Sequence, residues 1–138
     1  MTHIEPSAAQ FERLAASSVA DPGPVVMLNL LRFKERADGI DAADAISGAE
    51  AYERYGAAVT TFLARAGGRV LFAAQPHECV IGPEAAEWDL VLAVEYPSRQ
   101  AFLEMVGDSG YLEIHRHRAA ALADSRLIAC SLLAPPEL

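Results

Sequence analysis

The stretch VVMLNLLRF at residues 25–33 constrains the fold more than any other, because it is apolar at almost every position. A strand with one face in water alternates apolar and polar residues, whereas a strand covered on both faces is apolar throughout. Residues 25–33 therefore predict a central strand of a sheet. Asn29 is the polar residue inside the run, and Arg32 lies near its end.

Three further segments have the composition of strands. RVLFAAQ, with PHECVIG continuing it, covers residues 69–82, and Pro76 suggests an edge or a bulge there. WDLVLAVEY covers residues 88–96, and RLIACSLLA covers residues 126–134. The chain thus supplies four strands for one sheet.

Helical periodicity is strongest after Ser47, which forms a capping-box pattern with Glu50. Apolar residues then recur on one helical face, and a double glycine suits the C-terminal stop. These positions are Tyr52, Tyr55, Val59, Phe62, Leu63 and Ala66, followed by Gly67 and Gly68. Shorter helices are predicted at residues 99–106 and from Asp108 or Ser109 to about residue 123.

An additional helix is predicted near the N-terminus, at about residues 7–18, where Ser7 and Gln10 give a second capping-box pattern. After it, the elements follow the order β-α-β-β-α-β, which is the ferredoxin-like order. We therefore expect one α+β domain over residues 1–138, with a core at about 24–133 and an antiparallel sheet.

In this fold both helices of the repeat cover one face of the sheet. The strands, however, are apolar on both faces, so one helical layer cannot cover them all. A large exposed apolar face predicts a partner, and the simplest is a second copy packed sheet to sheet. The expected assembly is a homodimer in the form of an α/β barrel, with a higher oligomer left open.

Charge and composition limit the partners. The 138 residues carry a formal net charge of −8, which argues against nucleic acid and anionic membrane surfaces. No apolar run approaches the roughly 20 residues of a membrane span. The N-terminus has no signal-peptide pattern, and Cys79 and Cys130 fit reduced thiols, so we expect a cytoplasmic location.

The run His115-Arg116-His117-Arg118 looks like a single basic cluster. On a helix, however, residues two apart point about 200° apart, so the two histidines cannot share a metal or act as an acid/base pair. Arg116 falls on the solvent side, whereas Arg118 projects from an apolar stripe that contains Tyr111, Ile114, His115, Ala121 and Leu122.

A guanidinium on an apolar stripe needs a partner, because an unpaired buried charge is costly. One interpretation is structural: Arg118 pairs with a carboxylate such as Glu95 or Asp89, or donates to loop carbonyls. The other is functional: Arg118 anchors the carboxylate of a ligand. For His115 we weigh a satisfied histidine at the core edge against a proton donor or acceptor.

Other candidates are aromatic or polar residues next to apolar runs. Asn29 either makes a cross-strand or interface hydrogen bond or, if its face points away from the helices, orients a ligand inside the barrel. Arg32 suits a salt bridge at the rim of the cleft or a helix cap. Tyr55 and Trp88 are candidate apolar walls, the alternatives being helix core for Tyr55 and cover for the sheet end for Trp88.

A metal site is not expected. His77 and Cys79 would share a strand face, but two soft ligands do not make a site. No phosphate loop, nucleophile elbow or Ser/His/Asp arrangement is present, and no cofactor is expected.

Several stretches resemble the domain-of-unknown-function family thirteen-thirty, within the dimeric α/β-barrel superfamily. The resemblance covers roughly residues 24–132, and its most specific part is an aromatic-Pro-Ser strand end followed by a Ser, a Tyr and an Arg. Here these are Tyr96-Pro97-Ser98, Ser109, Tyr111 and Arg118. Gly110 stands where members often carry Pro. The resemblance implies a ferredoxin-like protomer and a face-to-face dimer.

The resemblance implies no activity, because the superfamily contains monooxygenases, isomerases, haem-dependent enzymes and binding proteins. The leading hypothesis is a cleft between sheet and helices that binds a small, anionic, partly apolar compound or performs cofactor-independent acid/base chemistry on it. Asn29, Tyr111, His115 and Arg118 would line that cleft. The alternative is a non-catalytic homo-oligomeric accessory protein whose polar core residues are structural.

Overall fold

The computed structural model describes residues 2–39 and 46–133 and contains four helices and four strands within these ranges. In chain order the elements are α1 (Ala8–Ala20), β1 (Val25–Phe33), α2 (Gly48–Ala66), β2 (Arg69–Ala74), β3 (Leu90–Tyr96), α3 (Arg99–Gly107), α4 (Ser109–Ala121) and β4 (Leu122–Cys130).

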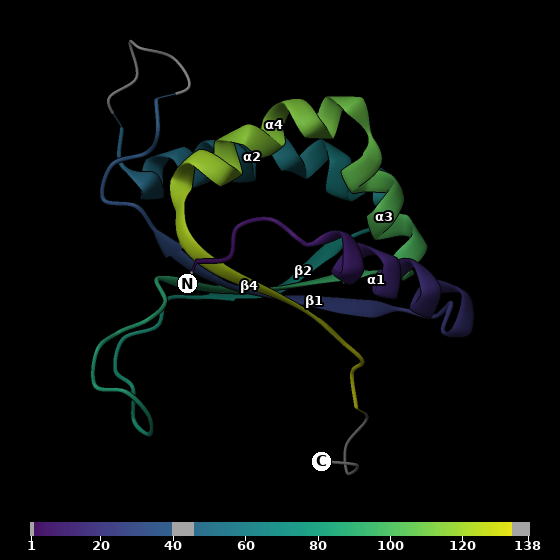
Figure 1. Cartoon of the computed structure of the whole chain (residues 1–138), viewed down its shortest axis with the longest axis horizontal. Helices are drawn as coiled ribbons and strands as arrows, with labels where there is room; N and C mark the ends of the chain where they lie inside the picture. The colour runs from purple at the N-terminus through teal and green to yellow at the C-terminus, as the bar shows by residue number, and fades with distance from the viewer. Residues whose placement is uncertain (1, 40–45, 134–138) are drawn as a thin grey trace.

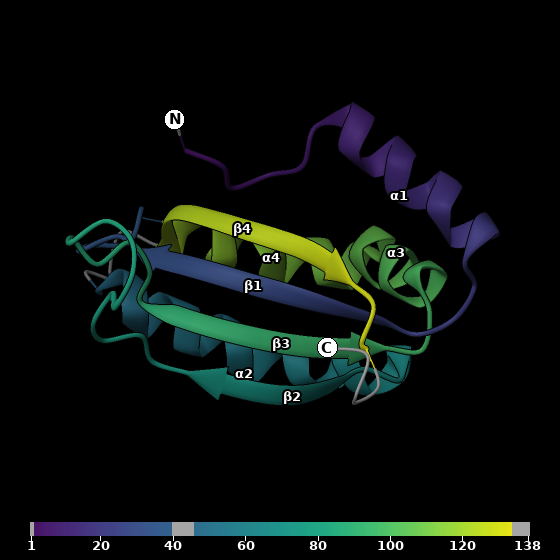
Figure 2. The same ribbon diagram turned by 90° about the horizontal axis from the view of Figure 1, so that it is seen from below.

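The strands form one antiparallel sheet in the order β2-β3-β1-β4 (Figure 2). Strand β1 pairs with β3 on one side and with β4 on the other, so the apolar run at residues 25–33 is central, as its composition predicts. This is the strand order of a ferredoxin-like α+β fold, and the expected fold class is confirmed.

Helices α2 and α4 lie side by side over one face of the sheet, and α3 covers its end (Figure 1). The N-terminal helix α1 stands apart and packs on α3, and the segment before it runs along the β4 edge of the sheet (Figures 1 and 2). None of the helices within the described ranges has the length and apolarity to cross a membrane.

Side-chain caps fix the helix ends that the sequence predicts. Ser7 and Gln10 form the complete capping box of α1, and Ser47 accepts a hydrogen bond from the Glu50 N–H at the start of α2. Gly67 ends α2 with φ of 75°, a left-handed conformation that suits glycine. Asp108 caps α4 by accepting from the N–H groups of its first turn.

Two predicted strand boundaries are wrong. Strand β2 ends at Ala74, and residues 75–89 form a loop that projects away from the helices (Figure 1). Val80 and Ile81 in that loop are 89% and 96% exposed, so their apolar character does not signal a strand. Strand β4 begins at Leu122 rather than at residue 126, because it pairs with β1 as far as Phe33.

The helices cover one face of the sheet and leave the other without a helical layer. Val25, Met27 and Leu31 face the helices and belong to the core, together with Val94 and Tyr96 of β3. On the opposite face the register places four apolar residues in one row across the sheet, which are Phe72, Ala93, Leu28 and Ile128.

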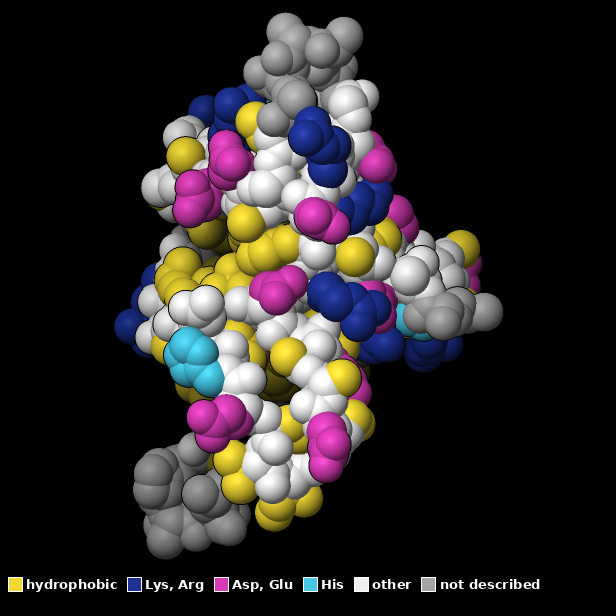
Figure 3. Space-filling view, turned by 90° about the vertical axis from the view of Figure 1, so that its left-hand side faces the viewer, with side chains coloured by type: hydrophobic (Ala, Val, Ile, Leu, Met, Phe, Trp, Pro, Cys, Tyr) yellow, Lys and Arg dark blue, Asp and Glu magenta, His cyan; other side chains and the backbone are white. Residues whose placement is uncertain are grey.

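The outer ends of this row are open, since Phe72 and Ile128 are 49% and 45% exposed. Figure 3 views the molecule from the side of the projecting loop and shows hydrophobic side chains gathered across the middle, between charged side chains of both signs. The exposed Phe72 and Ile128 thus leave apolar surface uncovered on the face of the sheet without helices.

Candidate functional site

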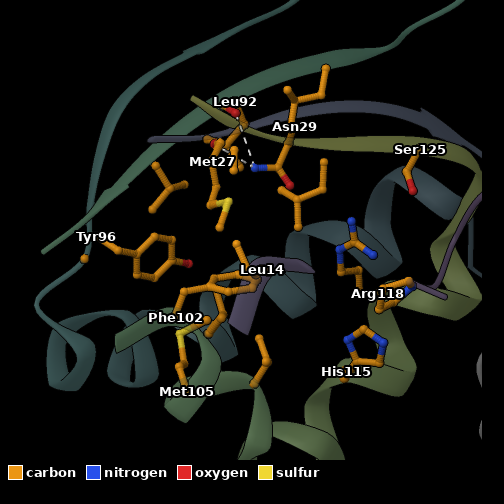
Figure 4. A pocket seen from close by; sticks show the side chains of 18 of the residues that line it. Leu14, Met27, Asn29, Leu92, Tyr96, Phe102, Met105, His115, Arg118 and Ser125 are labelled. Carbon is orange, nitrogen blue, oxygen red and sulfur yellow. Dashed lines mark hydrogen bonds between the residues drawn. The ribbon is translucent and has the colours of Figure 1, made fainter. Parts of the chain in front are cut away.

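A cavity of about 1640 Å³ lies between the helix-facing side of the sheet and the helices. Its floor is formed by β1, β3 and β4, and its other walls come from α2, α3 and α4. Helix α1 and residues 3–6 close one side, where Ile4 and Leu14 also pack on the core. Most of the lining is apolar, and polar groups project from a few positions (Figure 4).

Five of the seven candidates from the sequence meet at this cavity, although they come from three different elements. They are Asn29 of β1, Tyr55 of α2, and Tyr111, His115 and Arg118 of α4. Arg32 and Trp88 do not line it. Helical geometry therefore separates the basic run as predicted: Arg118 is buried, and Arg116 is exposed.

Arg118 is the only buried basic side chain within the described residues, with 7% of its surface exposed. Its Nη1 donates to the carbonyl oxygen of Ile4 at 3.3 Å. No carboxylate of the described part of the chain lies within ion-pair distance of it, and the suggested partners bind elsewhere. Glu95 pairs with Arg69, and Asp89 accepts from the Phe33 N–H.

A chain of hydrogen bonds connects the cavity to the surface. The Glu5 carboxylate lies 2.8 Å from His115 Nε2, and His115 Nδ1 lies 3.4 Å from the Tyr111 hydroxyl. The Tyr111 hydroxyl in turn lies 3.0 Å from that of Tyr55. Both ring nitrogens of His115 are thus engaged, and a proton change at His115 can reorient both hydroxyls.

The tyrosine hydroxyls of the cavity are neutral donors. Burial raises the pKa of Tyr55, and the neighbouring Tyr111 raises it further. Burial also raises the pKa of Tyr111 and Tyr52, although the positive charge of Arg118 opposes the increase in both. The site therefore offers neutral hydroxyls and one buried guanidinium, which suit an oxygen-bearing anion, and no phenolate base.

Asn29 lies on the helix-facing side of the sheet, not on the face away from the helices. Its side-chain N–H groups donate to the carbonyls of Met27 and Leu92, both at 3.3 Å, so its amide nitrogen makes the cross-strand hydrogen bond that the sequence suggests. Its oxygen points into the cavity (Figure 4). The amide can therefore accept a hydrogen bond from a ligand.

Arg32 and Trp88 belong to a separate cluster. The guanidinium groups of Arg32 and Arg126 stack on the Trp88 ring, 6.0 and 5.3 Å from its centroid, and both pair with Asp124. The backbone N–H of His3 also donates to Asp124, and this bond is the main cause that lowers its pKa to about 2, with burial opposing and Arg126 assisting. This cluster holds the N-terminal segment on β4.

His77 and Cys79 both lie exposed in the loop at residues 75–89, not on a strand face as expected. Within the described ranges, no group of three His, Cys, Asp or Glu side chains is placed to hold a metal ion.

Sequence reasoning missed the part of the site that the N-terminal segment provides. Ile4 and Glu5 contact Arg118 and His115 across more than a hundred residues, and no local pattern signals this approach. Tyr96 was also missed as a site residue. The strand pattern could have identified Tyr96, because it points to the same face of β3 as Leu92 and Val94, which line the same cavity.

Residues 41–130 match a domain of unknown function, DUF1330. The chain is 41% identical to RPA0582, a protein of unknown function from Rhodopseudomonas palustris, with a TM-score of 0.90 over 98% of this chain and 100% of that one. No curated protein matches the sequence.

More distant solved structures share the fold. A dimeric protein of unknown function with a ferredoxin-like fold from Bacteroides fragilis has a TM-score of 0.52 at 9% identity, over 80% of this chain and 97% of that one. A DABB family protein with a ferredoxin-like fold from Mesorhizobium loti has a TM-score of 0.52 at 11% identity, over 81% and 99%.

Proposed function

The chain belongs to the DUF1330 family, a family of domains of unknown function, and from its own cavity we propose that it binds a small organic anion between the sheet and the helices. The observation that carries this proposal is Arg118, a buried guanidinium at the cavity wall with no carboxylate of the described residues beside it. A carboxylate ligand would supply the missing charge.

Energetics favour a ligand at this position. Removing an ion from water costs several kcal/mol unless another charge and hydrogen bonds compensate, and the Ile4 carbonyl and the Tyr52 hydroxyl, both neutral, compensate only part. The planar guanidinium can hold a carboxylate through two parallel hydrogen bonds. The apolar lining around it would exclude water and strengthen this pairing.

A thermal-shift screen tests the proposal with benzoate, phenylacetate, hexanoate and decanoate. At least one of these anions should raise the melting temperature of the wild type and leave that of Arg118→Gln unchanged. Arg116→Gln is the matched control, since Arg116 lies on the same helix but is exposed and pairs with Glu113. It should respond as the wild type does.

If Arg118→Gln does not fold, Arg118→Lys can replace it. Lysine keeps the positive charge but cannot make two parallel hydrogen bonds to a carboxylate, so this variant should bind the anion more weakly than the wild type. If no anion shifts the wild type, and Arg118→Gln is merely less stable, the guanidinium is structural. The protein would then be a non-catalytic accessory protein of the kind considered above.

A second candidate function is cofactor-independent acid/base chemistry on the bound compound. It is favoured by the continuous path from Glu5 through His115 and Tyr111 to Tyr55. When the His115 ring is neutral, Tyr55 donates inward to Tyr111. When it is protonated, the directions reverse and the Tyr55 hydroxyl becomes free to donate to a ligand.

The protein would act as a homodimer formed through the outer face of the sheet. The row from Phe72 to Ile128 is apolar and partly open, which is unusual for a surface that faces water alone. Leu132 and Leu133, like the loop at residues 75–89, leave the sheet on this side and carry exposed apolar side chains (Figure 1). A second copy would cover these groups symmetrically.

A further inference from the structure

Tyr96 carries a hydroxyl group for which the protein provides no partner. The residue is 4% exposed, and its hydroxyl makes no hydrogen bond to any residue in the described ranges. Figure 4 shows the hydroxyl directed into the cavity. The described residues contain no fully buried side-chain oxygen or nitrogen without a partner, so this hydroxyl is open to the cavity rather than sealed in the core. An unpartnered donor that faces the cavity from a largely buried residue marks a second point at which a ligand would be held.

This point lies far from Arg118 along the sheet. Tyr96 pairs with Val25 at one end of β1, whereas Ser125, which lies beside the guanidinium in Figure 4, pairs with Leu31. Six residue steps along the strand lead from Val25 to Leu31, which corresponds to about 20 Å between their Cα atoms at a rise of ~3.3 Å per residue. The two side chains therefore enter the cavity from opposite sides, and because both reach inward, their polar groups lie closer together than these Cα atoms (Figure 4).

The wall between the two ends is mainly apolar. Its side chains come from β1, β3, α1 and α3, and they include Leu14, Met27, Leu92, Val94, Phe102 and Met105. Asn29 is the polar residue in this middle section, and its amide nitrogen is already engaged by two carbonyls. The middle of the cavity thus suits a hydrocarbon body.

The charge of the cavity decides which end takes the anion. Other arginines also line the cavity, but Asp21 neutralises Arg99 at 3.2 Å, and Arg69 and Arg126 likewise pair with carboxylates. Arg13 is exposed to solvent. Arg118 has no such carboxylate among the described residues. The anionic head therefore belongs at Arg118, and Tyr96, which burial keeps protonated by raising its pKa, offers a neutral O–H donor at the far end.

We propose that the ligand is an elongated apolar carboxylic acid with a hydroxyl or carbonyl oxygen at the end remote from its carboxylate. The carboxylate binds Arg118, the hydrocarbon body fills the middle, and the remote oxygen accepts the hydrogen bond of Tyr96. This assignment rests on the proposed anion-binding function and adds the class of compound.

Calorimetric titration with octanoate, decanoate, dodecanoate and their ω-hydroxy counterparts tests the assignment. At the matching chain length the wild type should bind the hydroxy acid about 3- to 10-fold more tightly than the parent acid, the value of one hydrogen bond. Tyr96→Phe should abolish this preference. Arg118→Gln should weaken both acids by about tenfold or more.

The outcomes separate the two ideas. If the parent acids bind through Arg118, but no chain length shows a preference that Tyr96→Phe removes, the assignment of the ligand class is wrong and anion binding stands. If neither series binds the wild type, or Arg118→Gln binds both as well as the wild type does, the anion site itself is wrong.

Discussion

The hydroxyl oxygens of Tyr55 and Tyr111 lie 3.0 Å apart, although 56 positions separate the two residues in the sequence. The contact joins α2 to α4 across the roof of the cavity, and the two rings meet edge to face. Tyr111 also reaches His115, so its hydroxyl serves both partners. This pair therefore couples the packing of the helical layer to the polar end of the site.

Loss of the Tyr111 hydroxyl should destabilise the protein more than loss of the Tyr55 hydroxyl. Tyr55→Phe removes one hydrogen bond and should lower the free energy of unfolding by about 1 kcal/mol. Tyr111→Phe leaves both Tyr55 and His115 without that partner and should cost about 1–3 kcal/mol. Denaturant titration of both single variants and of the double variant measures these changes in the free energy of unfolding. Additive effects in the double variant would show that the two hydroxyls are not coupled.

Gly48 should tolerate no side chain. A Cβ atom there would clash with the Lys34 carbonyl and come within 2.6 Å of the Ala121 carbonyl, and these backbone atoms cannot move independently. Gly48→Ala should lower the free energy of unfolding by about 2–4 kcal/mol. In the same helix Gly56 has open space around it, so Gly56→Ala should be neutral or stabilise by up to about 1 kcal/mol. Thermal unfolding compares the two, and equal effects would contradict the packing described.

Asp124 should make stability depend on acid pH. Its pKa is lowered to about 2 in the folded state, below the ordinary value of about 3.9, so its stabilisation is complete above pH ~4 and is lost as the pH falls toward 2. Asp124→Asn should therefore be less stable than the wild type near neutrality, and the difference should shrink between about pH 4 and 2. Denaturant titration across this range measures it. A difference that is independent of pH would show that the lost carboxylate charge is not the cause.

A charge on the outer face should break the dimer. Phe72→Glu and Ile128→Glu place carboxylates at the two ends of the apolar row, where sheet-to-sheet packing would bury them. Light scattering should show a mass near twice that of the chain for the wild type and near that of the chain for both variants. Val19→Glu, on the exposed side of α1, is the control and should remain dimeric. A monomeric wild type would contradict the interface.

Much of the fold could be predicted from local patterns. The capping residues Ser7, Ser47 and Ser98 and the left-handed Gly67 mark helix ends, and the run at residues 25–33 has the composition of a central strand. Strand boundaries were less predictable, because pairing decides them. Strand β4 begins at Leu122 since β1 offers partners that far, and the loop at residues 75–89 is apolar without being paired.

The site divides in the same way. Helical periodicity separates Arg118 from Arg116, and strand parity places Asn29 with Met27, because both depend on the fixed geometry of a single element. The contacts of Ile4 with Arg118, of Glu5 with His115, and of Trp88 with Arg32 and Arg126 depend on how distant segments pack. The sequence by itself thus determined the elements, their order and which side chains face inward. Only the tertiary structure decided which of them share the cavity, because the number of residues between two positions does not tell whether the folded chain brings their side chains together.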